Sequence, residues 1–412
     1  MGMKDRAVSF CNFVIYWSMI AIPVAASFSS AAVDAFIGFM GVSFILKKIL
    51  TRDAAIPRTP INLPFALLVL VSLLSFFNSV NLHSSLQGIL KLMKYSLVIF
   101  IPAAEIRDRR HFIRILAALL FGLFSSSFDA IYQLITGFDL YRHHAYDSII
   151  GLARLKAAFP HTNIFAGYLA LFTPLSIALL LYHFKGRARM ILDIIVITAL
   201  FCLMHTFCRS AIVGVWLAVI VMALIRKDRI ILLLAIVAAL AVPFLLPGNI
   251  KDWAKTTGSV SEFLLNKERF VLYETSFNMI KHHPWLGVGV NTYSLNYQKY
   301  KLHDTSAETA NTAWYAHNSY LQMAGETGLT GLLIFIWLLY LFFSRGFAFY
   351  RKSGDNLLRV CCLGMLMGTL AFLVNGLTET NLYYPKIATL FWFQAGILLG
   401  MIRGSENNAL QG

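Results

Sequence analysis

Long apolar runs separated by short polar connections occupy this chain from end to end. Of its 412 residues, 58% are hydrophobic and 13% are charged, whereas a typical soluble domain is about 25% charged. A helix of about 20 apolar residues crosses the hydrocarbon core of a bilayer and satisfies its own backbone hydrogen bonds there. The sequence therefore predicts an all-α, polytopic integral membrane protein.

Twelve segments have the length and polarity of a membrane-spanning helix. The first follows Lys4 and Arg6, which is also the charge order of a signal peptide, but the many later spans favour an uncleaved helix. We expect spans at about residues 9–27, 30–47, 63–79, 87–104, 111–136, 164–183, 189–207, 210–226, 230–247, 323–344, 357–377 and 387–402.

Every second connection between these spans is basic. Cytoplasmic loops carry an excess of Lys and Arg, so we expect the basic loops and both termini to face the cytoplasm of a bacterial inner membrane. The net charge of +15 then follows from topology, and we expect membrane lipids but no nucleic acid as partners. The residues concerned are Lys47, Lys48, Arg52, Arg58, Arg107, Arg109, Arg110, Lys185, Arg187, Arg189, Arg226, Lys227, Arg229, Arg345, Arg351 and Lys352.

This pattern divides the chain into three parts: nine spans in residues 1–247, an external loop with short helices in 248–316, and three spans in 317–412. The cysteines lie in or beside apolar runs without the spacing of a disulfide framework or a zinc site. We therefore expect no disulfide, metal or cofactor. These cysteines are Cys11, Cys202, Cys208, Cys361 and Cys362.

Two arginines lie on the predicted external side, where the charge rule does not place Arg209. Arg209 stands in the tight turn "HTFCRSAIVG" (205–214), and Arg269 begins an apolar-periodic helix that is followed by "PWLGVGVNTY" (284–293). Either arginine could be a solvated or lipid-facing residue. As a functional residue, each would offer a planar fork of donors to phosphate.

A histidine also lies on this side, in "AHNSYLQMAGETGLTGLLIF" (316–335). His317 could be structural, or it could act as a general base near neutral pH. Gly325, Gly328 and Gly331 interrupt the following span, so we expect a short helix packed closely under the external loop. Lys91 and Lys94 begin the fourth span at helical spacing and could either hold carrier phosphates or extend toward lipid headgroups.

At these residues the chain resembles the O-antigen ligase and O-antigen polymerase superfamily of bacterial envelope glycosyltransferases. The resemblance is carried by "TFCRSAIVG", by Arg269 with "HHPWLGVGVNTY", by "HNSYLQMAGETGLTGLL" and by "FPHTNIFAGYLALFTP" (159–174), over about residues 150–345. Cys208 departs from the small hydroxylated residue that many relatives have before this arginine.

The resemblance implies a GT-C-type helical fold. It also implies metal-independent transfer of a glycan from undecaprenyl diphosphate at the periplasmic face, with Arg209 and Arg269 binding the donor diphosphate and His317 as the catalytic residue. A single displacement by the acceptor hydroxyl would invert the anomeric centre. Asn318, His161, Lys91 and Lys94 are candidates for supporting residues. The acceptor would be lipid A-core in a ligase, which the compact loop favours, or another carrier-linked glycan in a polymerase.

A lipid-glycan transporter is the alternative from a different class. Transporters place ionisable groups or broken helices near the midplane in both halves of the chain. Asp34, Asp129, Glu379 and Asp193 lie instead toward helix ends, and no second segment matches the glycine-interrupted one. The sequence therefore favours the enzyme.

Overall fold

Helices make up nearly all of the structure, a computed structural model that describes residues 2–53, 55–106, 108–149, 151–245, 267–302 and 315–406. In these ranges, nine helices are long and apolar enough to cross a membrane, which confirms an all-α polytopic membrane protein. The nine are α1 (Met3–Ala25), α4 (Leu82–Glu105), α5 (Arg109–Thr136), α6 (Thr162–Tyr182), α7 (Gly186–His205), α8 (Arg209–Arg226), α15 (Ser319–Lys352), α16 (Asn356–Asn375) and α17 (Pro385–Glu406).

The predicted count of twelve spans is not confirmed. The three remaining segments are helical, but α3 (Asn62–Leu74), even with the 3₁₀ turn η1 (Ser75–Asn78), and α9 (Arg229–Leu245) are shorter than the other spans. The third, α2 (Ser30–Thr51), packs along α1 and carries Asp34, Lys47 and Lys48. The smaller elements are β1 (Asp147–Ile149), β2 (Leu152–Arg154), α12 (Lys267–His282), α13 (Tyr293–Tyr300) and the 3₁₀ turn η2 (Asn381–Tyr383).

The core is centred on α6, α16 and α17, which are buried around nearly their whole circumference. A helix that is apolar all round is typical of such a position. Small residues let the backbones approach: a Cβ on Gly364 would lie 2.8 Å from the Cα of Leu175, and one on Gly368 would clash with the Leu171 carbonyl. Small residues serve the same purpose at helix contacts in membranes generally.

A glycine turn docks onto a break in α15. Gly328 has φ 73° and interrupts α15, and Gly287 (φ 67°) faces it so closely that a Cβ on either residue would clash with the other segment's backbone. The Val288 amide donates to the Gly325 carbonyl at 2.9 Å, and the Leu329 amide donates to the Pro284 carbonyl at 2.7 Å. The predicted short helix packed under a folded-back loop is therefore present.

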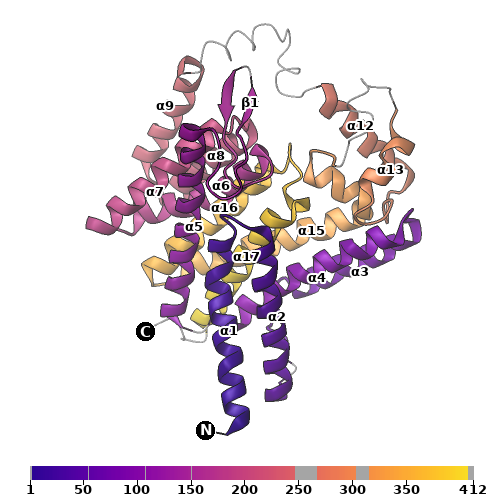
Figure 1. Ribbon diagram of the computed structural model, residues 1–412, viewed down its shortest axis with the longest axis horizontal. Helices are drawn as coiled ribbons and strands as arrows, with labels where there is room; N and C mark the ends of the chain where they lie inside the picture. The colour runs from indigo at the N-terminus through magenta and orange to yellow at the C-terminus, as the bar shows by residue number, and fades with distance from the viewer. Residues whose placement is uncertain are drawn as a thin grey trace.

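The two ends of the molecule carry different elements. In Figure 1 both chain ends are marked in the lower part of the view, whereas β1, α12 and α13 lie in the upper part. The hairpin β1–β2 is antiparallel and pairs Asp147 with Arg154. Of the predicted external loop, residues 248–316, the structure describes 267–302 and 315–316.

Candidate active site

Arg209 is the first residue of α8, directly after the tight turn from α7. Phe207 in that turn has φ 51°, and the side-chain amide of Asn375 donates to Ser210 Oγ at 2.8 Å, which ties the start of α8 to the end of α16. The Arg209 side chain is exposed and lies close enough to Arg269 for the two positive charges to repel. The structure therefore brings the two predicted arginines into one electropositive region.

Arg269 lies in the first turn of α12, as the sequence predicts. Its Nη2 donates to Glu379 Oε1 at 2.6 Å, in an ion pair where the arginine side chain is 25% exposed and the glutamate side chain only 2%. A guanidinium has five donors in a planar fork. This contact engages one nitrogen and leaves the part of the fork that reaches solvent available to an anion.

His317 immediately precedes Asn318, the N-cap of α15, and has φ 48°. Its Nδ1 lies 3.3 Å from Glu379 Oε2, and its side chain is 37% exposed. The hydroxyl of Tyr273 on α12 donates to the His317 carbonyl, also at 3.3 Å. Asn318 is the N-cap of α15, and its side chain accepts from the Tyr320 and Leu321 amides. These contacts fix the histidine at a helix start while its side chain stays partly exposed.

Glu379, in the connection between α16 and α17, joins these segments. Besides Arg269 and His317, it accepts a hydrogen bond from Asn163 Nδ2 at 2.8 Å. Burial by itself raises the pKa of this carboxyl. The hydrogen bond from His317 and the charge of Arg269 outweigh the burial, so the pKa of Glu379 lies below its ordinary value of 4.5. The group is a carboxylate at neutral pH.

Arg154 on β2 extends the same network. Its Nη2 donates to Asn163 Oδ1 and its Nε to the Thr206 carbonyl, both at 3.0 Å. Because Thr206 lies in the turn before Arg209, this side chain connects the turn with the start of α6. The cluster of Arg154, Asn163, Arg269, His317 and Glu379, with Arg209 beside it, therefore unites six segments of the chain.

Three members of this cluster were not predicted from the sequence. Glu379 was considered only as an acidic residue toward a helix end, and Asn163 and Arg154 were not singled out. Asn163 does stand in the quoted segment 159–174, two residues after His161. The side chain of His161 is exposed, and its carbonyl accepts from the amides of Ile164 and Phe165.

The helix α12 has an exposed aromatic face and a different, buried face. Phe270 and Phe277 are 55% and 60% exposed. The helix instead buries Leu272, Ser276 and Met279, because the hydroxyl of Ser276 has partners in the loop: it donates to the Leu272 carbonyl at 2.7 Å and contacts Tyr293 Oη at 2.9 Å. The helix is present, but its inner face is partly polar.

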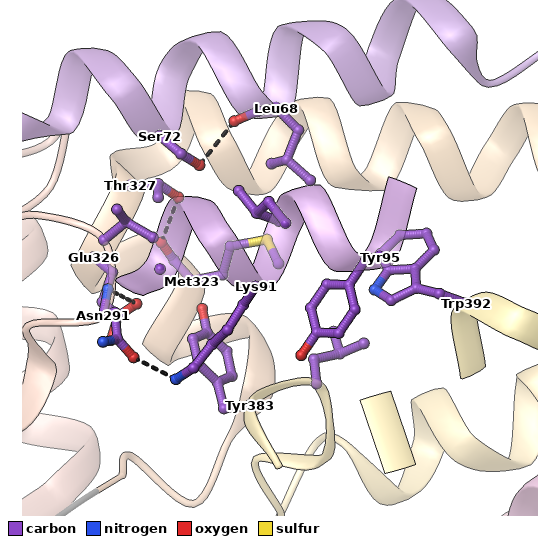
Figure 2. A pocket seen from close by; sticks show the side chains of 14 residues that line it. Leu68, Ser72, Lys91, Tyr95, Asn291, Met323, Glu326, Thr327, Tyr383 and Trp392 are labelled. Atoms are coloured by element: carbon purple, nitrogen blue, oxygen red, sulfur yellow. Dashed lines mark hydrogen bonds between the residues drawn. The ribbon is translucent and has the colours of Figure 1, made fainter. Parts of the chain in front are cut away.

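The two lysines of α4 have different partners. Lys94 pairs with Asp34 at 3.0 Å, whereas Lys91 points inward and donates to Asn291 Oδ1 at 2.8 Å. Figure 2 shows Lys91 and Asn291 at one side of a cavity of about 80 Å³, whose wall also includes the buried Glu326. The Asn291 amide donates to Glu326 Oε2 at 2.7 Å. Lys91 therefore lines a cavity, and Lys94 does not.

Metal ligands do not gather in the part of the chain that the structure describes: it contains no group of three or more His, Cys, Asp or Glu side chains placed to hold an ion. The cations of the site are arginines, whose guanidinium charge persists at all working pH values. The arrangement can bind an anion and place a carboxylate-paired imidazole beside it.

Comparison with known proteins relates one part of the chain to a known family. Residues 194–336 match the model of the Wzy_C family, described as O-antigen ligase, which covers O-antigen ligases and related polymerases. A search of curated proteins found no match. The matched segment, about a third of the chain, contains Arg209, Arg269 and His317, whereas Asn163 and Glu379 lie outside it. Over this segment the chain is similar to the O-antigen ligase family.

Proposed function

We propose that the protein is a glycosyltransferase that moves O-antigen, or a related polysaccharide, from undecaprenyl diphosphate to lipid A-core at the periplasmic face of the inner membrane. The observation that carries the proposal is the grouping of Arg209, Arg269 and His317 at one end of the helices. The similarity of residues 194–336 to O-antigen ligases supports it. A GT-C-type arrangement of the helices is part of the proposal.

The proposed reaction is a single displacement. The acceptor hydroxyl oxygen attacks the anomeric carbon of the donor, the bond from that carbon to the diphosphate oxygen breaks, and undecaprenyl diphosphate leaves with the bonding electron pair. Arg209 and Arg269 stabilise the negative charge that develops on the leaving group, and His317 Nε2 takes the hydroxyl proton. Attack from the face opposite the leaving group inverts the anomeric centre, and no step requires a metal.

Asn318 and Lys91 have supporting roles in this proposal. Asn318 caps α15 and so holds the backbone next to His317. Lys91 lies in the cavity between α4 and α15, where its charge is available to a phosphate of the carrier. Lys94 is already paired with Asp34, and the contacts given above for His161 are those of its backbone carbonyl. Both residues are therefore weaker candidates for direct contact with the substrate.

The acceptor distinguishes the ligase from its alternatives. The purified protein is given carrier-linked glycan together with equal amounts of lipid A-core and a second carrier-linked glycan, and the products are separated. We expect the glycan on lipid A-core. Elongation of the second carrier-linked glycan would replace the ligase by a polymerase. Movement of intact carrier-linked glycan across a vesicle membrane, without transfer, would support the transporter.

The topology predicts which positions react in intact cells. Gln298 on α13 is exposed, as is Ala55 between α2 and α3. A cysteine at position 298 is expected to react with a membrane-impermeant thiol reagent in intact spheroplasts, and one at position 55 only after lysis. The unaltered chain is the blank, because its five cysteines are all buried. The reverse pattern would contradict a periplasmic site.

A further inference from the structure

We infer that Glu379 is a positioning residue that holds the base and one diphosphate-binding arginine in a fixed relation to each other. This inference rests on the proposed function, because it names what orients His317 and Arg269 for that reaction. Glu379 itself lies beneath the two residues and contacts no substrate. Three features of the structure support the assignment.

The first feature is the division of contacts between the two carboxylate oxygens. Oε1 accepts from Arg269 Nη2 at 2.6 Å and from Asn163 Nδ2 at 2.8 Å, whereas Oε2 faces His317 Nδ1 at 3.3 Å. A carboxylate is rigid and planar, so these contacts fix the distance and the angle between the guanidinium and the imidazole. The site therefore presents its cation and its base as one preorganised unit.

The second feature is burial. The Glu379 side chain is 2% exposed, and a buried carboxylate is stable only when charged or hydrogen-bonding partners replace the lost water. Its pKa is held below the ordinary value of 4.5, as described above, so it remains an acceptor at neutral pH. It can accept the Nδ1 proton of His317, which leaves Nε2 with its lone pair for the acceptor hydroxyl. When Nε2 takes that proton, the adjacent carboxylate stabilises the imidazolium.

The third feature is the support behind the carboxylate. Arg154 donates to Asn163 Oδ1 and to the Thr206 carbonyl, which orients the Asn163 amide so that its nitrogen points at Glu379. At metal sites, replacing a residue that only orients a ligand typically lowers activity by about 10- to 100-fold, and we apply the same reasoning to Asn163 and Arg154. The hairpin β1–β2 thereby contributes to the geometry of His317 without touching it.

Side-chain and main-chain roles of Glu379 are separable. The packing of the 376–379 segment onto α15 runs through backbone carbonyls: the Ser319 amide donates to Gly376 at 2.9 Å, and the Ser319 hydroxyl donates to the Glu379 carbonyl at 2.9 Å. A Glu379→Gln substitution keeps these bonds and the side-chain volume. It removes the charge and one acceptor, so it tests positioning without removing the anchor.

The experiment measures donor KM, kcat and the pH profile of transfer for Glu379→Gln in the full-length protein. We expect kcat to fall by about 10- to 100-fold, and the acid limb of the profile to move to lower pH, since Gln carries no charge to stabilise a protonated imidazole. Glu274→Gln on α12 is the matched control and is expected to resemble the wild type. An unchanged kcat and an unchanged acid limb would overturn the inference.

Asn163→Ala provides a second variant that keeps the Glu379 charge. We expect a smaller loss of kcat, with the acid limb where it is in the wild type, because only the orientation of the carboxylate is affected. If Glu379→Gln does not fold, this variant decides the matter: a wild-type kcat would overturn the inference. Absence of transfer by the wild-type protein would refute the proposed function instead, so the two failures are distinguishable.

Discussion

Replacing His317 by alanine is expected to lower kcat for glycan transfer by about 10²- to 10⁴-fold, the usual contribution of general-base catalysis. We propose the imidazole as the group that takes the acceptor proton, because Nδ1 faces Glu379 at 3.3 Å and the side chain is 37% exposed. Donor binding, measured separately by titration with carrier-linked glycan, is expected to change little. A loss confined to kcat distinguishes proton transfer from substrate binding.

The control for this variant is His282→Ala. His282 is also an exposed histidine of the external elements, but its Nδ1 contacts the Asn278 carbonyl of its own helix. It is expected to transfer glycan at the wild-type rate. A His317→Ala protein that keeps its fold and a near-normal kcat would refute the base assignment.

Replacing either Arg209 or Arg269 by lysine is expected to reduce kcat/KM for the donor by about 10- to 100-fold, the range of one lost hydrogen bond to a charged group. Lysine keeps the charge but not the planar fork that binds phosphate through two nitrogens. For Arg269 the variant also weakens the contact with Glu379, so we expect the larger loss there. Donor KM and kcat are measured for each.

Arg345→Lys is the matched control for the arginine variants. Arg345 lies on α15 well beyond the break at Gly328 and is exposed. It is expected to behave as the wild type. If Arg209→Lys and Arg269→Lys retained full kcat/KM, charge alone would suffice, and bidentate phosphate binding would be excluded.

The helices and the three main site residues were accessible from sequence because their signals are local. A run of apolar residues predicts its own helix, and Gly325, Gly328 and Gly331 predicted an interruption that the structure shows at Gly328. Arg209 was conspicuous because a cation at the external membrane surface contradicts the charge rule, and Arg269 because it begins a helix, whose N-terminus favours a bound anion. His317 stands in a short polar segment beside a long apolar one.

The remainder of the site depends on contacts between distant segments. Glu379 meets His317 across 62 positions, Arg269 across 110 and Asn163 across 216. No spacing in the sequence encodes these pairs. The residues meet only in the folded chain, where the start of α6, the start of α12 and the segment after α16 lie together. From the sequence, an acidic residue after a membrane span looks the same whether its role is structural or functional.

The span count stays a prediction for a physical reason. Hydropathy counts apolar residues without regard to the length of the helix that forms, and α3 and α9 are shorter than the nine candidate spans.

The most direct test of the account is a stoichiometric transfer assay in EDTA. Purified protein in detergent is incubated with carrier-linked glycan and lipid A-core, and both released undecaprenyl diphosphate and glycosylated lipid A-core are quantified. The account predicts equal amounts of the two products, an inverted linkage, and an undiminished rate in the chelator. Release of carrier without glycosylated lipid A-core, or loss of transfer in EDTA that Mg²⁺ restores, would contradict it.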